Sequence, residues 1–171
     1  MIGRAALATV LAGVLATGAV AAAEAPVSIP TSPALTAIDP KTGETVALDP
    51  SQGPMHVAFI ATWCRPCLAE LPKLADLEDR WKPEGYRLFL VAVATRQTPE
   101  RLRELMAQGP LPGRLLFDAS GAVASAFGAA TIPAQVLVDR RGLIVARSGP
   151  LDQKFAQAVE RLVRQEGLVK P

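Results

Sequence analysis

The chain has 171 residues, of which 50% are hydrophobic and 20% are charged, and its 18 basic and 16 acidic side chains give a formal net charge of +2 at pH 7. This size and composition allow one domain with a substantial hydrophobic core and argue against intrinsic disorder. The charged residues form no run of one sign long enough for a nucleic-acid footprint, so we expect no nucleic-acid partner.

The first residues indicate an exported protein. Arg4 precedes nineteen uncharged residues, 5–23, which end in three alanines. This pattern is typical of a secretory signal peptide that is cleaved after Ala23. Nineteen residues also just reach the length of a membrane span, so an N-terminal anchor facing the periplasm is the alternative. With cleavage, we predict a signal peptide at 1–23 and a mature protein in the periplasm, an oxidising compartment in which disulfides persist.

The segment after the signal peptide is rich in proline. Residues 24–33 include Pro26, Pro30 and Pro33, which argues against a regular helix and predicts an extended linker. We expect the fold to begin after this linker and the domain to occupy residues 34–171. Its first element should be a small β-hairpin, because two short apolar segments flank the turn-forming residues 39–43.

The region from residue 55 to about residue 108 has the pattern of strand, helix, strand and helix. The continuous apolar run 55–62 predicts a strand buried on both faces, followed by a helix to about Trp81. A second buried strand at 86–94 completes a βαβ unit, which should be right-handed. Thr98-Pro99-Glu100 supplies a cap, a first-turn proline and an early acid, and so predicts a helix to about Gln108.

The last third of the chain completes an α/β fold. The predicted elements are a strand at 115–117, a short helix at 120–127, strands at 134–139 and 143–147, and an amphipathic helix at 151–165. The tight turn between the last two strands requires them to be antiparallel. The fold class is therefore a central mixed β-sheet flanked by helices, with an N-terminal β-hairpin.

Cys64 and Cys67 are the only cysteines, and they lie between the 55–62 strand and the helix that follows it. A disulfide ring this small constrains few residues and contributes little stability. The spacing instead indicates a switchable dithiol at the carboxyl end of a central strand, where open α/β sheets place their sites. At a helix N-terminus, the pKa of a cysteine falls from about 8.5 to roughly 3.5 to 7.5, and the neighbouring Arg65 acts in the same direction.

Other uses of these cysteines have little support in the sequence. Structural zinc normally needs four ligands, whereas the chain has two cysteines and one histidine in total. Leu68 stands where a c-type haem site would have a histidine. The single histidine, His56, is interpreted as a strand-end residue rather than a catalytic base. We therefore predict no cofactor and no metal.

Two segments resemble a known family. Residues 59–72, with Trp63-Cys64-Arg65-Pro66-Cys67 at their centre, resemble the active-site stretch of thioredoxin-like proteins, and more closely that of the exported TlpA/ResA-type branch. Ile132-Pro133-Ala134, with the strand and turn that follow, resembles the cis-proline loop of the same family. The resemblance covers roughly residues 35–165 and implies a thioredoxin-like fold.

The resemblance also implies roles for particular residues. Cys64 would be the attacking thiol, and Cys67 the buried resolving thiol. Pro72 would kink the helix, since the family has a proline at that spacing. Pro133 would form a cis bond after Ile132 and lie against the disulfide, which leaves backbone groups free to bind an extended substrate. The expected substrate-binding residues are Trp63, Arg65, Pro66, Ile132 and Pro133.

Glu70 has two interpretations. It matches an acidic residue that, in ResA-type proteins, lies near the cysteines and tunes their proton affinity, so it would be catalytic. Alternatively, it is a solvated glutamate on an amphipathic helix. Cytosolic thioredoxins have a buried acid at the position of Ala58, and its replacement here leaves proton handling to Glu70 or to water. The family often has threonine where Ala134 precedes Gln135, so substrate contacts can also differ.

The resemblance implies an exported thiol-disulfide oxidoreductase, preferably a reductase of protein cysteines. Its partners would be protein thiols or disulfides and a membrane-embedded electron donor, and apocytochromes c awaiting haem attachment are a family-based candidate substrate. A net disulfide oxidase is one alternative. A copper-binding chaperone is another, because Cu(I) suits thiolate ligands, although the chain lacks the longer cysteine spacing and the placed histidine of that branch.

Overall fold

The computed structural model describes residues 27–28 and 35–167. The predicted signal peptide and most of the predicted linker lie outside the described residues, so their assignments remain predictions. No helix in the described part of the chain is both long enough and apolar enough to cross a membrane.

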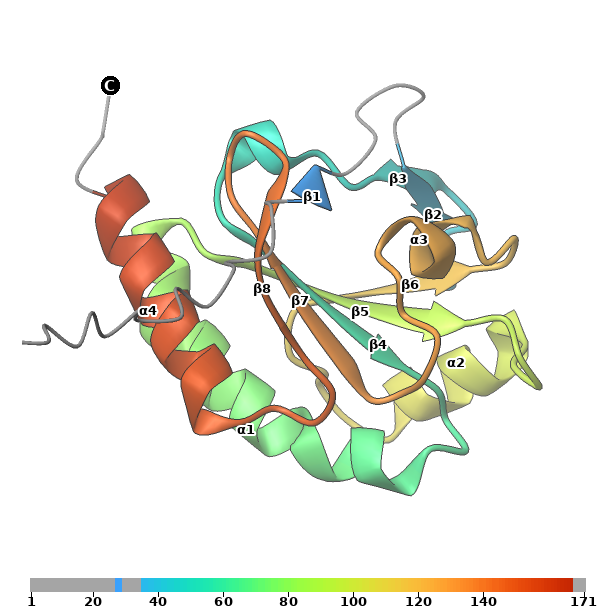
Figure 1. The fold of residues 1–171 in the computed structure, drawn as a ribbon. Helices are drawn as coiled ribbons and strands as arrows, with labels where there is room; N and C mark the ends of the chain where they lie inside the picture. Colours follow the sequence, from blue (N-terminus) through green and yellow to red (C-terminus); the bar gives the residue numbers. More distant parts are fainter. Residues whose placement is uncertain (1–26, 29–34, 168–171) are drawn as a thin grey trace, which may run out of the picture.

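One mixed β-sheet forms the centre of the fold, as predicted (Figure 1). Its strand order is β1-β8-β7-β4-β5-β6-β2-β3. β4, β5 and β6 run parallel, whereas β7 and β8 pair antiparallel to each other and β7 pairs antiparallel to β4. The strands are β1 (Val27–Ser28), β2 (Thr36–Ile38), β3 (Thr45–Ala47), β4 (Met55–Ile60), β5 (Arg87–Val93), β6 (Arg114–Asp118), β7 (Ala134–Val138) and β8 (Leu143–Ser148).

Helices cover both faces of this sheet and enclose two core layers (Figure 1). The α-helices are α1 (Arg65–Trp81), α2 (Pro99–Ala107), α3 (Ala122–Ala126) and α4 (Gln153–Gly167), and short 3-10 turns span Pro50–Gln52 and Lys82–Glu84. One layer packs Leu74 of α1, Leu102 of α2 and Phe155 of α4 against the sheet. The other packs Val123 of α3 against β4 and β5. Burial of these apolar side chains is the main favourable contribution to folding.

α1 follows β4 after the short segment 61–64, and the local sequence favours both elements. All six residues of β4 are buried, which fits a strand covered on both faces. Pro66 lies in the first helical turn, where a missing N–H costs nothing. α1 buries one face, formed by Cys67, Glu70, Leu74 and Trp81, and it contains Pro72 in its interior as expected.

Two expectations for the edges of the sheet had different outcomes. The predicted hairpin is confirmed, because β2 and β3 pair antiparallel around residues 39–44. The prediction that the fold begins after the linker is wrong for Val27–Ser28, which pairs with Ile144 and Leu143 of β8. An edge strand exposes unpaired backbone groups, and this short partner covers part of that edge.

Candidate active site

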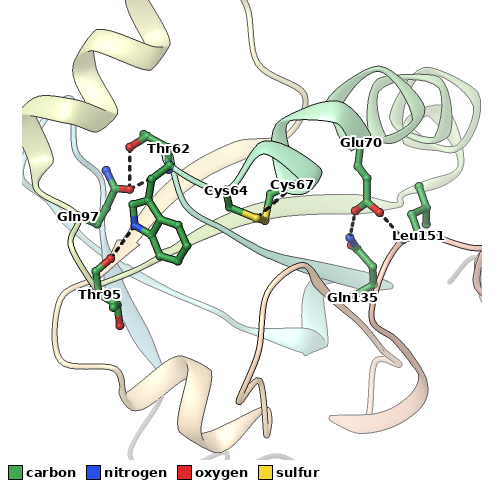
Figure 2. The surroundings of a disulfide bond; sticks show 9 residues. Thr62, Cys64, Cys67, Glu70, Thr95, Gln97, Gln135 and Leu151 are labelled. Atoms are coloured by element: carbon green, nitrogen blue, oxygen red, sulfur yellow. Dashed lines mark hydrogen bonds between the residues drawn. A yellow bond between two sulfur atoms is a disulfide. The ribbon is translucent and has the colours of Figure 1, made fainter.

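The two cysteines form a disulfide at the N-terminus of α1 (Figure 2). Their Sγ atoms lie 2.06 Å apart. Cys64 is the N-cap residue of α1, and its sulfur accepts a hydrogen bond of 3.3 Å from the backbone N–H of Cys67. Cys64 is 6% exposed, whereas Cys67 is fully buried. Both cysteines are thus largely buried, and Cys64 is the one that keeps some exposed surface.

The start of α1 is positively polarised. The first backbone N–H groups of a helix lack intrahelical partners, and the helix dipole adds partial positive charge at this end. Arg65 is exposed beside Cys64 and adds a full positive charge. In the reduced protein, this setting favours a Cys64 thiolate over a thiol.

Trp63 forms an aromatic wall that the loop between β5 and α2 holds in place. Its indole N–H donates a hydrogen bond of 2.8 Å to the carbonyl oxygen of Thr95, and the guanidinium of Arg96 lies 4.6 Å from the centre of its ring. Gln97 of the same loop is hydrogen-bonded to Thr62, which lies two residues before Cys64. Its Oε1 accepts from the backbone N–H and the hydroxyl of Thr62 at 2.9 and 3.0 Å. Sequence reasoning missed this buried glutamine, which no motif marked.

The predicted cis-proline loop lies at the same end of the central strands as the cysteines. The Ile132–Pro133 peptide bond is cis, as expected. In the register of β7 against β4, Ala134 pairs with Phe59, near the carboxyl end of β4. Ile132 is partly buried and contacts both core layers, which fixes the base of the loop.

Glu70 lies in the core, so the interpretation of a solvated glutamate is wrong. The side chain is 7% exposed. Its Oε2 accepts a hydrogen bond of 2.8 Å from Nε2 of Gln135, and its Oε1 accepts one of 2.8 Å from the backbone N–H of Leu151 (Figure 2). No lysine or arginine of the described residues forms an ion pair with it. Glu70 stands one helical turn after Cys67 on the same face of α1.

His56 is more deeply placed than its interpretation as a strand-end residue suggested. It is the second residue of β4, but its side chain is fully buried, with its ring centre 4.8 Å from that of Phe155. Its Nδ1 lies 2.5 Å from the Tyr86 hydroxyl, and its Nε2 lies 2.8 Å from Oε1 of Gln135. Burial lowers the pKa of His56 from 6.5 to about 4, and the hydrogen bond to Gln135 opposes this shift only in part.

The residues described do not gather a metal site. Nowhere in 27–28 and 35–167 do three or more His, Cys, Asp or Glu side chains lie together in an arrangement that could hold an ion. Both ring nitrogens of His56 are already hydrogen-bonded. Copper binding by this chain would therefore rest on the two cysteine thiolates alone.

Comparison with known proteins assigns the family. Residues 31–147 match the model of the AhpC/TSA family, which is more than half of the chain. The chain belongs to the AhpC/TSA family. This match and the fold described above confirm the resemblance to thioredoxin-like proteins.

Individual relatives have related names. The chain is 25% identical over 87 residues to the thiol-disulfide oxidoreductase ResA of Bacillus thuringiensis subsp. konkukian, an alignment that covers 51% of this chain and 49% of ResA. It is 26% identical over 133 residues to sporulation thiol-disulfide oxidoreductase A of Bacillus subtilis, covering 76% and 80%. The chain thus spans about half the length of the first curated relatives it matches.

Solved structures agree on the fold. A crystal structure of a thiol:disulfide interchange protein of the thioredoxin family from Chlorobium tepidum superposes with a TM-score of 0.67 at 20% identity. The superposition covers 83% of this chain and 99% of that one. At this identity the likeness establishes the thioredoxin-like fold alone.

The buried histidine should make the fold sensitive to acid. Between about pH 6.5 and pH 4 the unfolded chain binds a proton at His56 that the folded protein excludes, so stability falls as the pH falls through this window. We expect His56 to account for a loss of about 3 kcal/mol between pH 7 and pH 4. Denaturant unfolding of the oxidised protein at a series of pH values measures this loss.

A His56→Gln variant is the control, because glutamine keeps a polar side chain but does not titrate. It should lose this part of the pH dependence whatever its stability at pH 7. An unchanged difference in unfolding free energy between pH 7 and pH 4 would contradict the assignment.

Proposed function

We propose that this protein is a thiol-disulfide oxidoreductase that reduces disulfides of protein substrates. One observation carries the proposal: Cys64 caps a helix N-terminus, is 6% exposed, and is bonded to Cys67, which is fully buried. Such a pair has one accessible nucleophile and one protected resolving thiol. The relatives named thiol-disulfide oxidoreductases support the same activity.

The reaction needs only the two cysteines and a substrate disulfide. The Cys64 thiolate attacks one substrate sulfur, the substrate S–S bond breaks, and the released thiolate takes a proton. Cys67 then loses its proton and attacks Sγ of Cys64, which breaks the mixed disulfide and releases the second substrate thiol. The substrate gains two electrons and two protons, and the protein is left with the Cys64–Cys67 disulfide.

Glu70 is the proposed proton acceptor for Cys67. A buried thiol is a poor nucleophile until it is deprotonated, and burial disfavours the thiolate. Glu70 stands one helical turn after Cys67 on the same buried face of α1, and each of its carboxylate oxygens accepts one hydrogen bond. A carboxylate has about four acceptor sites, so capacity remains for the proton of Cys67, received directly or through one water.

Substrate binding is proposed to use the surface around Cys64. Trp63 is 38% exposed and offers a flat aromatic wall, and Arg65 and Pro66 are exposed on the first turn of α1. The loop at Ile132 and Pro133 is proposed to pair through its backbone with an extended substrate segment, as the family resemblance implies. These contacts suit a protein or peptide disulfide better than a small molecule.

Export and the supply of electrons belong to the same proposal. Residues 1–23 have the pattern of a signal peptide, which supports a periplasmic location, with an N-terminal anchor as the alternative. A reductase in an oxidising compartment must be reduced again after each turnover, so we propose a membrane-embedded electron donor. Protein cysteines awaiting haem attachment in cytochrome c maturation are the proposed substrate class.

Serine variants of the two cysteines test the reaction order. With dithiothreitol as electron donor and a disulfide-linked peptide as substrate, both Cys64→Ser and Cys67→Ser should reduce the rate to the uncatalysed background. Only the Cys67→Ser variant should accumulate a mixed disulfide with the peptide, because only Cys64 is accessible to it. Mass spectrometry under non-reducing conditions detects this adduct. Retained activity in a folded Cys64→Ser variant would contradict the proposal.

A Glu70→Gln variant tests the proton acceptor. An aryl disulfide whose released thiolate is coloured separates the two steps, since attack by Cys64 releases one equivalent and attack by Cys67 releases the other. We expect the second phase at neutral pH to slow by about 10²-fold and the first to change little. Glu104→Gln, an exposed carboxylate on α2, is the matched control and should leave both phases unchanged.

The direction of electron flow follows from the reduction potential of the cysteine pair. We expect a value near or below about −270 mV, in the range of reductants, when the protein is equilibrated against thiol buffers. A value near about −120 mV is typical of an oxidant and would reverse the proposed direction.

A further inference from the structure

Four buried polar side chains from four parts of the fold form one hydrogen-bonded chain. It runs from Tyr86, just before β5, to His56 on β4, Gln135 on β7 and Glu70 on α1, with successive distances of 2.5, 2.8 and 2.8 Å. None of the four side chains is more than 7% exposed. His56 and Ala58 point to the same face of β4, and Ala58 pairs with Gln135, so the chain crosses the core layer beneath α1 and α4.

The chemistry of the groups fixes the direction of every donor. An ionised Glu70 accepts only, so Gln135 must turn its amide N–H toward the carboxylate and its Oε1 toward His56. Nε2 of His56 must then carry the proton, and Nδ1 accepts from the hydroxyl of Tyr86. All three hydrogen bonds donate toward Glu70, and only one neutral tautomer of His56 fits.

We propose that Gln135, His56 and Tyr86 are positioning residues that hold the Glu70 carboxylate in its proton-accepting orientation beside Cys67. This inference rests on the role of Glu70 proposed above. When Cys67 attacks, its S–H bond breaks, the proton goes to Glu70, and the sulfur electron pair forms the bond to Cys64 as the substrate thiolate leaves. Donors aimed at the carboxylate stabilise its ionised form, which is the form that can accept that proton.

Other titratable groups lie near this chain and bear on its pH dependence. Cys67 lies on the same buried face of α1 as Glu70. Leu151, whose N–H donates to Glu70, lines a surface pocket together with four charged residues, Lys73, Asp76, Arg80 and Asp152. Glu78 of α1 acts on Tyr86, and burial together with this negative charge raises the pKa of the phenol. Tyr86 therefore remains a neutral hydroxyl donor over the range in which thiols react.

The test measures the pH profile of the second kinetic phase, the attack by Cys67, in stopped-flow reactions with the aryl disulfide. Gln135→Leu removes one donor to the carboxylate and should move the midpoint of this profile upward by about one pH unit. Tyr86→Phe removes a single hydroxyl further along the chain and should move it in the same direction by less. Val136→Ala, also on β7 but in the other core layer, is the matched control and should leave the midpoint unchanged.

Two variants at His56 separate positioning from simple packing. His56→Gln retains a donor that can reach Oε1 of Gln135 and should keep most of the wild-type profile. His56→Leu fills the space without a donor and should shift the midpoint upward. Equal profiles for these two variants, or a wild-type midpoint in a folded Gln135→Leu protein, would overturn the inference.

A second measurement does not depend on activity. His56 is the only histidine in the chain, so a ¹⁵N spectrum of histidine-labelled protein reports it without ambiguity. We expect the neutral form protonated at Nε2 near pH 7, whereas protonation at Nδ1 would overturn the proposed direction of the chain. If the Cys67→Ser variant forms no mixed disulfide with the peptide, the proposed function fails, and this spectrum still decides the arrangement of the donors.

Discussion

A carboxylate that is buried without a cationic partner constrains which side chains can surround it in the layer between the sheet and α1. Such a group must be met by donors or take up a proton, because an unpaired buried charge costs several kcal/mol. Glu70 meets the constraint with the amide of Gln135 and the backbone N–H of Leu151. Gln135 is itself buried, so its oxygen needs a donor in turn, which His56 supplies. The burial of this one carboxylate therefore explains why polar side chains, His56 on β4 and Gln135 on β7, stand in an otherwise apolar layer.

The difference in burial between the two cysteines has a separate origin, which is the junction of β4 and α1. Cys64 caps the helix and is 6% exposed, whereas Cys67, three residues further along, is fully buried in the core. Trp63 is fixed on the outer side by Thr95, and Thr62 by Gln97, so the segment before the cysteines cannot move freely away from the sheet. The proposed order of thiol reaction is thus a consequence of where one helix begins.

Most of the fold could be predicted from the sequence because its signals are local. The apolar run of β4, the cap and proline that open α2, and the tight turn into β8 each depend on neighbouring residues. The buried contacts of Glu70 and His56 could not be predicted. They join residues 65 and 79 positions apart, and a lone polar residue in an apolar strand carries no periodic signal. The strand pair of Val27–Ser28 with β8 was missed because two residues are too short to show alternation.

Ala58 connects the departure from the thioredoxin pattern with the observed network. It is the register partner of Gln135, so the two side chains lie side by side on the same face of the sheet. An acid at Ala58 would stand beside the amide that donates to Glu70, and two buried carboxylates would then compete for one donor and oppose each other's charge. Because Ala58 carries no carboxylate, the Gln135 amide can donate to Glu70 without this competition. In the proposed mechanism the proton acceptor therefore stands on the helix that carries Cys67 rather than on the sheet, and the donor amide of Gln135 stabilises a carboxylate at this buried position.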